Sequence, residues 1–159
     1  MAQTHAPVVR KAVAPDEPAI LALIDELADY EKLDRQLPDA RARLIRDLFG
    51  PKPRIECFLA FMDGYPVGYA LILETYSSFR ALPTLFLEDL FVLEEYRARG
   101  VGRALFEKAL GEAKRRGCGR MDWTVLHWNQ PAIDFYLRQG AEHLSEWQLF
   151  RINLAPAEV

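Results

Sequence analysis

Two glycines flanked by arginines stand where a strand-like apolar run gives way to a helix-like run, in the pattern Arg97-x-x-Gly100-x-Gly102. The amides of a first helical turn have no partner inside the helix, and glycine lets a ligand approach the backbone closely. The helix dipole and the side chains of Arg97, Arg99 and Arg103 favour an anion. The spacing predicts a pyrophosphate site, and the alternative is a tight turn with solvated arginines.

Two common phosphate motifs are excluded at this turn. The dinucleotide fingerprint needs a third glycine or an alanine where Leu105 stands, and the P-loop sequence Gly-Lys-Ser/Thr is absent.

A second group of polar and aromatic residues follows further along the chain. Asn129 is suited to cap a helix that begins at Pro131. Ala132, Phe135 and Tyr136 then share one helical face at spacings of three and four. The alternative interpretation makes Phe135 and Tyr136 core residues, with the Tyr136 hydroxyl hydrogen-bonded internally.

The elements that position these residues follow from hydrophobic periodicity and turn signals. Asp39 is a plausible N-cap with Gly50 as the stop of that helix, and Asp63-Gly64 is a strong hairpin signal. Strands are expected at 8–13, 55–61, 65–76, 84–92, 120–126 and 147–154, and helices at 16–30, 39–49, 101–116 and 131–139. This order predicts an α/β fold, a mixed sheet with helices on both faces. The strands on either side of the long helix should be the parallel pair, because they need a crossover.

Bulk properties narrow the class of protein. The 159 residues suit a single domain, and a net charge of -3 argues against nucleic acid as the main partner. Two cysteines, Cys57 and Cys118, favour a reducing, cytoplasmic setting over a disulfide scaffold. No apolar stretch is long enough for a membrane span, and the cysteines and three histidines show no metal-ligand spacing. We therefore expect no membrane and no metal.

Together, the two motifs resemble the GNAT superfamily of N-acetyltransferases, the first its acyl-CoA pyrophosphate loop and the second its helix beside the thioester. The segments 26–31, 87–92, 128–136 and 147–152 further resemble the diamine, or spermidine/spermine, acetyltransferases. The likeness runs from about Val9 to Leu154. One departure is the loop before Trp147, which is shorter and poorer in glutamate than in the polyamine enzymes and argues against a long polycationic substrate.

The resemblance implies acetyl transfer from acetyl-CoA to a primary amine of a small molecule, in a homodimer whose last strand contributes to the interface. It implies a mainly antiparallel sheet with a splayed parallel pair at the acyl-CoA site. The implied acetyl-CoA residues are Leu90, Phe91, Val92, Arg97, Ala98, Arg99, Gly100, Val101, Gly102, Arg103, Asn129, Pro131, Ala132 and Tyr136. The implied acceptor residues are Tyr30, Glu31, Glu88, Asp89, Asp122, Trp123 and Thr124.

The resemblance also assigns catalytic roles. An alkylamine with a pKa near 10 must lose a proton before it attacks a thioester, and Glu88 matches the family's base, acting through water. Tyr136 matches the general acid for the CoA thiolate, and the Leu90 amide matches the oxyanion donor. Glu88 and Asp89 are adjacent, so in a strand they face opposite ways unless a bulge intervenes. A solvated strand end or an ion pair is the alternative for Glu88.

Other interpretations stay open. Tyr30 and Trp123 are nearly as well explained by core packing as by substrate contact. A GNAT enzyme could instead acetylate a protein lysine, an N-terminus or another small amine, and a silent acyl-CoA sensor is a third class. The presence of both Glu88 and Tyr136 argues against the silent sensor.

Overall fold

The computed structural model describes residues 5–155, which form two compact units. The first unit ends at Trp123 and contains the whole sheet, and the second begins at Thr124. The strands, paired in chain order, are β1 (Val8–Lys11), β2 (Glu56–Met62), β3 (Tyr65–Ser77), β4 (Leu82–Val92) and β5 (Arg120–Asp122). The helices are α1 (Glu17–Glu31), α2 (Pro38–Phe49), α3 (Val101–Arg115) and α4 (Gln130–Arg138), with 3-10 turns η1 (Ala14–Asp16) and η2 (Glu94–Tyr96).

The sheet is mixed, as the sequence predicts. All neighbouring strands are antiparallel except β4 and β5, which run parallel on either side of the crossover helix α3. The hairpin between β2 and β3 is confirmed, since Asp63 and Gly64 both have positive φ, 50° and 83°. Two successive left-handed residues match the right-handed twist of the flanking strands.

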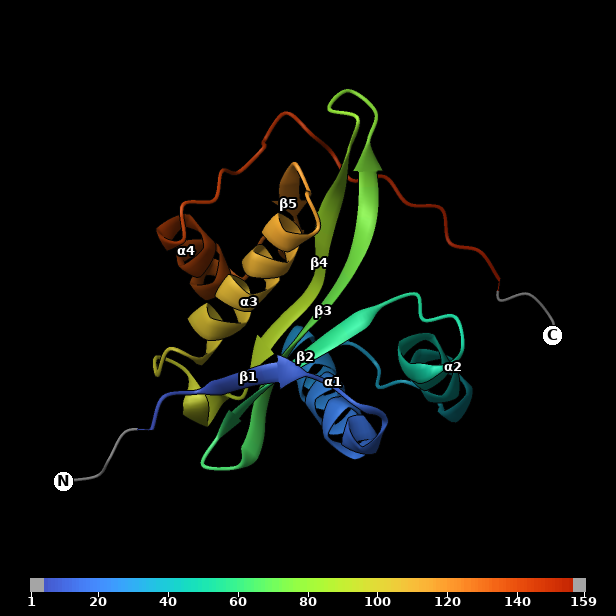
Figure 1. Ribbon diagram of the computed structural model, residues 1–159, viewed down its shortest axis with the longest axis vertical. Helices are drawn as coiled ribbons and strands as arrows, with labels where there is room; N and C mark the ends of the chain where they lie inside the picture. The colour runs from blue at the N-terminus through green and yellow to red at the C-terminus, as the bar shows by residue number, and fades with distance from the viewer. Residues whose placement is uncertain (1–4, 156–159) are drawn as a thin grey trace. The chain divides into compact units, whose positions relative to one another are not determined.

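Helices cover both faces of the sheet within the first unit (Figure 1). On one face, α1 and α2 pack their apolar side chains against the sheet. This core includes Ile20, Leu23, Leu48, Cys57, Leu59, Tyr69, Leu71 and Phe91. On the other face lies α3, whose Lys108 sits over the Phe58 ring and whose Leu105 lies against Gly68. Successive residues of β2 and β3 therefore alternate between two apolar layers.

Three expected elements differ most clearly from the structure. Helix α2 begins at Pro38, with Leu37 rather than Asp39 at the N-cap. Proline suits the first helical position, because its ring fixes φ and it lacks the N–H that would be left unpaired there. Strand β5 stops at Asp122 instead of continuing to residue 126, because its pairing with β4 ends at Phe86.

The third difference is that residues 147–154, expected to be a strand, form no strand among the described residues. The apolar alternation is present, but a strand also needs a neighbour to accept its backbone hydrogen bonds. The large side chains of this segment are exposed, namely Trp147, Leu149, Phe150, Ile152 and Leu154. Separately, none of the helices in the described residues has the length and apolar character needed to cross a bilayer.

A close backbone approach makes Gly68 of β3 sensitive to substitution. A Cβ at this position would lie 2.7 Å from the Phe91 carbonyl oxygen of β4. We expect Gly68→Ala to lower the free energy of unfolding by about 1–3 kcal/mol, because β3 and β4 must move apart. Gly111→Ala is the control. Its Cβ meets nothing within 4 Å, and the change should raise stability by about 0.5–1 kcal/mol. Urea unfolding measures both, and a neutral Gly68→Ala would contradict the packing.

Candidate active site

One extra residue in β4 interrupts its pairing with β3. Leu87 pairs with Ile72 and Asp89 pairs with Leu71, so Glu88 has no residue opposite it. Such a bulge re-aims the side chains around it. Glu88 is exposed, whereas the flanking Leu87 is buried. The sequence analysis required a bulge if Glu88 and Asp89 were both to face one site, and the structure has such a bulge at Glu88.

The bulge exchanges the two faces of β4. Before it, Leu87 lies opposite Ile72 in the layer under α3, and after it Phe91 lies opposite Tyr69 in the layer under α1. A shift of one residue moves every later side chain to the opposite face. Asp89 consequently faces the α1 layer, where its Oδ2 accepts a 3.0 Å hydrogen bond from the Tyr69 hydroxyl.

Asp89 lies within electrostatic reach of two other carboxyl groups, those of Glu88 and Glu31. Loss of hydration on burial raises the pKa of Asp89 to about 6, the Tyr69 hydrogen bond opposes this, and the charges of Glu88 and Glu31 add to the rise. Burial also raises the pKa of Glu31, at the end of α1. None of the three carboxylates forms an ion pair with another described residue. This arrangement favours a cationic guest.

Beyond the bulge, β4 has no paired strand on its β5 side among the described residues. The parallel pairing comprises Thr84 with Arg120, Leu85 with Met121 and Phe86 with Asp122, and then it stops. This is the splayed parallel pair that the family resemblance implies. Apart from the Val92 carbonyl, which accepts a hydrogen bond from Arg97, the β4 backbone from residue 87 to 92 has no strand partner at that edge and could pair with an extended ligand.

The turn from β4 into α3 has the features of an anion site. Gly100, the N-cap of α3, has φ 82°, and Ala98 has φ 59°. The first helical hydrogen bond runs from the Ala104 amide to the Gly100 carbonyl, and no side chain caps the helix. The amides of residues 101–103 thus have no backbone or capping partner among the described residues. These amides suit the pyrophosphate of acetyl-CoA.

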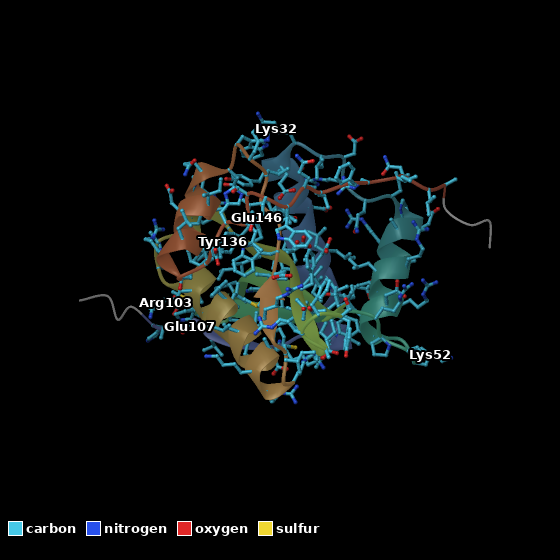
Figure 2. All side chains as sticks on the ribbon, turned by 90° about the horizontal axis from the view of Figure 1, so that it is seen from above. Lys32, Lys52, Arg103, Glu107, Tyr136 and Glu146 are labelled. Carbon is cyan, nitrogen blue, oxygen red and sulfur yellow. The ribbon has the colours of Figure 1, made fainter. Side chains whose placement is uncertain are left out.

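The three arginines of this turn all contact other residues of the protein, and Arg99 lies over the Tyr96 ring, 5.4 Å from its centroid. Arg97 donates from Nε to the Val92 carbonyl at 3.0 Å, and its guanidinium lies over the Tyr30 ring, 4.8 Å from the centroid. Arg103 pairs with Glu107 at 2.8 Å on exposed α3 surface, as their neighbouring positions in Figure 2 illustrate. An exposed pair of this kind is weak and easily exchanged. Arg97 therefore fastens the turn to β4 and α1, and its contact with phosphate stays a prediction.

Three other predicted acceptor residues of the first unit, Tyr30, Trp123 and Asp122, are packed or paired. The Tyr30 ring lies 6.4 Å from that of Phe91, and Trp123 meets Phe106 edge-on at 5.5 Å. Asp122 forms an ion pair with Arg120, whose Nε lies 3.2 Å from Asp122 Oδ2. These contacts match the core-packing interpretation of Tyr30 and Trp123, while their contact with substrate stays a prediction. Thr124 is exposed and belongs to the second unit.

The second unit contains α4 with the predicted cap. Asn129 Oδ1 accepts a 3.4 Å hydrogen bond from the Ala132 amide, with Pro131 in the first turn. The rings of Phe135 and Tyr136 meet edge-on, with centroids 5.3 Å apart. Tyr136, labelled in Figure 2, is half-buried on α4. The cap is confirmed, and the catalytic role of Tyr136 stays a prediction.

Sequence reasoning missed Tyr69. A tyrosine within the apolar run 67–73 was a usable signal, because a buried tyrosine hydroxyl needs a hydrogen-bond partner.

Cys57 is also buried near Asp89, and burial raises the pKa of its thiol to about 12, so the thiol stays protonated and suits a structural role. Among residues 5–155, no group of three or more His, Cys, Asp or Glu could hold a metal ion.

A cavity of about 360 Å³ lies where β2 begins, lined in part by Arg54, Glu56 and Arg116. Glu56 is already paired with Lys11 at 2.8 Å and with Arg116. None of the predicted site residues lines this cavity. We therefore place the candidate active site at the β4 bulge rather than here.

Comparison with known proteins assigns the family. The model of the acetyltransferase (GNAT) family matches residues 20–141. A thialysine N-epsilon-acetyltransferase from Bos taurus is 36% identical over 157 residues, which are 92% of each chain. A human spermidine/spermine N(1)-acetyltransferase-like protein 1 is 35% identical over 155 residues, 91% of this chain and 22% of that protein.

The fold agrees with this assignment. The structure of AAC(6')-Iy in complex with a CoA bisubstrate analog aligns at TM-score 0.78 and 20% identity, over 94% of this chain and 100% of that chain. The protein belongs to the GNAT family and resembles its polyamine acetyltransferases. It is an acetyl-CoA-dependent N-acetyltransferase.

The amides at the start of α3 give a direct prediction. Gly102→Asp would place a side chain and a negative charge where the pyrophosphate should bind, so acetyl-CoA affinity should fall by roughly tenfold or more, about 1.4 kcal/mol. Gly111→Asp on the same helix is the control, because that position is open and ten residues from the turn's first amides. Calorimetry measures the acetyl-CoA affinity of both variants, and an unchanged affinity in Gly102→Asp would show that the pyrophosphate does not bind at this turn.

Proposed function

We propose that this enzyme transfers acetyl directly from acetyl-CoA to the primary amine of a small cationic molecule, such as a lysine-like amino acid or a short diamine. The carboxyl groups of Glu31, Glu88 and Asp89 carry this proposal. Asp89 lies within electrostatic reach of both Glu31 and Glu88, and none of the three forms an ion pair with another described residue. A protonated amine would neutralise part of this charge on binding.

Two further observations bear on the size of the amine. The relatives are named for thialysine and for spermidine/spermine, so their names cover both a lysine-like amine and longer polyamines. The loop before Trp147 comprises only His143 to Glu146 after the preceding turn, so it offers few carboxylates to a long polycation. We therefore place thialysine, lysine and short diamines ahead of spermine.

We assign acetyl-CoA to the splayed edge of β4 and the start of α3. The pyrophosphate would bind the amides from Gly100 to Arg103, and the pantetheine would follow the β4 backbone near Val92. The remaining residues proposed to bind acetyl-CoA are Leu90, Phe91, Arg97, Ala98, Arg99, Asn129, Pro131, Ala132 and Tyr136. The proposed acceptor residues beside the three carboxylates are Tyr30, Asp122, Trp123 and Thr124.

The proposed chemistry needs no covalent enzyme intermediate. Glu88, acting through water, accepts the proton of the bound ammonium, and the neutral nitrogen attacks the thioester carbonyl. The Leu90 amide stabilises the resulting oxyanion. The C–S bond then breaks, and Tyr136 gives its proton to the departing CoA thiolate. The acylated nitrogen loses its second proton, which restores the Tyr136 hydroxyl through solvent. The products are the N-acetylated amine and CoA.

We further propose a homodimer in which the segment from Trp147 to Ile152 contributes to the interface and to the acceptor site. The support is the row of exposed apolar side chains, with Trp147 74% and Phe150 85% exposed. Large apolar surface of this kind marks interaction sites. Sedimentation at micromolar concentration should find a dimer, and a monomer alone would contradict this assignment.

An acetyl-transfer screen tests the substrate class. The panel should contain thialysine, lysine, short diamines, spermine, an aminoglycoside, and peptides with an acceptor lysine or a free N-terminus. We expect kcat/KM for thialysine or a short diamine to exceed that for the peptides by at least roughly tenfold. Preference for a peptide would overturn the proposal in favour of protein acetylation. Binding of acetyl-CoA with no transfer to any amine would indicate a silent sensor.

Tyr136→Phe tests the general acid. The change removes one hydroxyl and keeps the ring, so packing against Phe135 should survive. If Tyr136 protonates the thiolate, kcat should fall by roughly 10²–10⁴, with acetyl-CoA affinity nearly unchanged. Single-turnover kinetics should be used so that chemistry is the step observed.

A matched control is Tyr65→Phe, which removes a hydroxyl from an exposed tyrosine at the start of β3. It should keep full turnover. Near-normal single-turnover rates in Tyr136→Phe would identify Tyr136 as a packing residue.

A further inference from the structure

The buried hydroxyl of Tyr69 has one hydrogen-bond partner on the acceptor side of the site. Tyr69 is fully buried in the layer between the sheet and α1, and its ring lies 6.5 Å from that of Phe91. Its hydroxyl donates to Asp89 Oδ2 at 3.0 Å, from the strand next to the bulge. Burial and the nearby carboxylate hold the pKa of Tyr69 well above its usual value, so the phenol keeps its proton and stays a donor.

Every other titratable group that faces Asp89 is neutral or negative. Glu31 from α1 and Glu88 from β4 carry negative charge, and the Cys57 thiol from β2 stays protonated. The guanidinium of Arg97 lies over the Tyr30 and Phe91 rings and is not paired with Asp89. Among the groups that act on Asp89, only the Tyr69 hydroxyl lowers its pKa. The Tyr69 hydrogen bond thus favours the ionised form of Asp89, which burial and the charges of Glu31 and Glu88 disfavour.

We propose that Tyr69 is a positioning residue of the acceptor site, which fixes the Asp89 carboxylate and keeps it charged so that Asp89 anchors the cationic acceptor while Glu88 handles the transferred proton. This inference rests on the proposed function of the same site. It adds a division of labour between the adjacent acids, because the bulge leaves Glu88 exposed and turns Asp89 towards Tyr69.

The first test does not need turnover. Carbon-13 labelling of aspartate side chains allows the Asp89 carboxyl to be titrated by NMR, with Asp89→Asn assigning the signal. Wild type should titrate with a midpoint of about 6. In Tyr69→Phe, the lost hydrogen bond should raise the midpoint by roughly one pH unit. An unchanged midpoint in folded Tyr69→Phe would overturn the proposal, even if no substrate is found.

The second test uses thialysine as the acceptor and follows KM against pH. A raised midpoint leaves less Asp89 ionised near pH 6.5, so the ratio of variant to wild-type KM should be roughly threefold there and close to one by pH 8.5. The KM for acetyl-CoA should stay unchanged. A purely structural role would instead change kcat, or both KM values, by the same factor at every pH, which would overturn the inference.

A double-mutant cycle separates action through Asp89 from a direct effect. In the Asp89→Asn background, Tyr69→Phe should produce no further change in thialysine KM, because the group it supports is absent. Additive effects would contradict the proposal. If wild type acetylates no amine while the NMR midpoint still shifts, the proposed function fails and the Tyr69–Asp89 coupling survives, so the two failures can be told apart.

Discussion

The site depends on a single unpaired residue in β4. Glu88 has no residue opposite it on β3, and this one insertion reverses which side chains of β4 face α1 and which face α3. Without it, Asp89 would point into the apolar layer under α3, where an ionised carboxylate would cost several kcal/mol. With it, Asp89 reaches the Tyr69 hydroxyl and Glu88 stays exposed. A local backbone irregularity thus places two adjacent acids in different environments, one exposed and one hydrogen-bonded to Tyr69.

The same strand also leads into the proposed acetyl-CoA site. Pairing with β5 ends at Phe86, just before the bulge, so the part of β4 that carries the acids is the part with a free edge. The chain then turns into α3 through Ala98 and Gly100, both in the left-handed region. The uncapped start of α3 follows the acidic segment after a short turn. One short stretch of chain therefore contains both the acids and the amides that we propose bind acetyl-CoA.

Much of the fold could be predicted because its signals are local. The Asp63-Gly64 turn, the Asn129 cap and the crossover around α3 each follow from a few neighbouring residues. The short β5 and the absence of a strand over residues 147–154 could not be predicted, because strand pairing depends on distant partners. Alternation of Phe150, Ile152 and Leu154 shows strand propensity, while pairing requires a neighbour.

In the candidate site, too, local features could be predicted from the sequence and contacts between distant segments could not. The glycine turn and the acid pair were visible as motifs, whereas the position of the bulge between Leu87 and Asp89 depends on register with β3. The Tyr69 partner and the stacking of Arg97 on Tyr30 are contacts across the sheet and between distant segments, which residue types alone do not specify. A charged side chain near a predicted anion site can equally well serve packing, as Arg97 does.

The pH–rate profile of Glu88→Gln tests the role of the bulge most directly. The change keeps the shape and removes the proton acceptor, with Glu94→Gln as an exposed control on η2. Turnover of thialysine should fall by roughly 10²–10⁴ at pH 7 and recover as pH rises, since free amine then becomes abundant without a base. The control should keep the wild-type profile. A wild-type profile in Glu88→Gln would show that the residue at the bulge does not handle the proton.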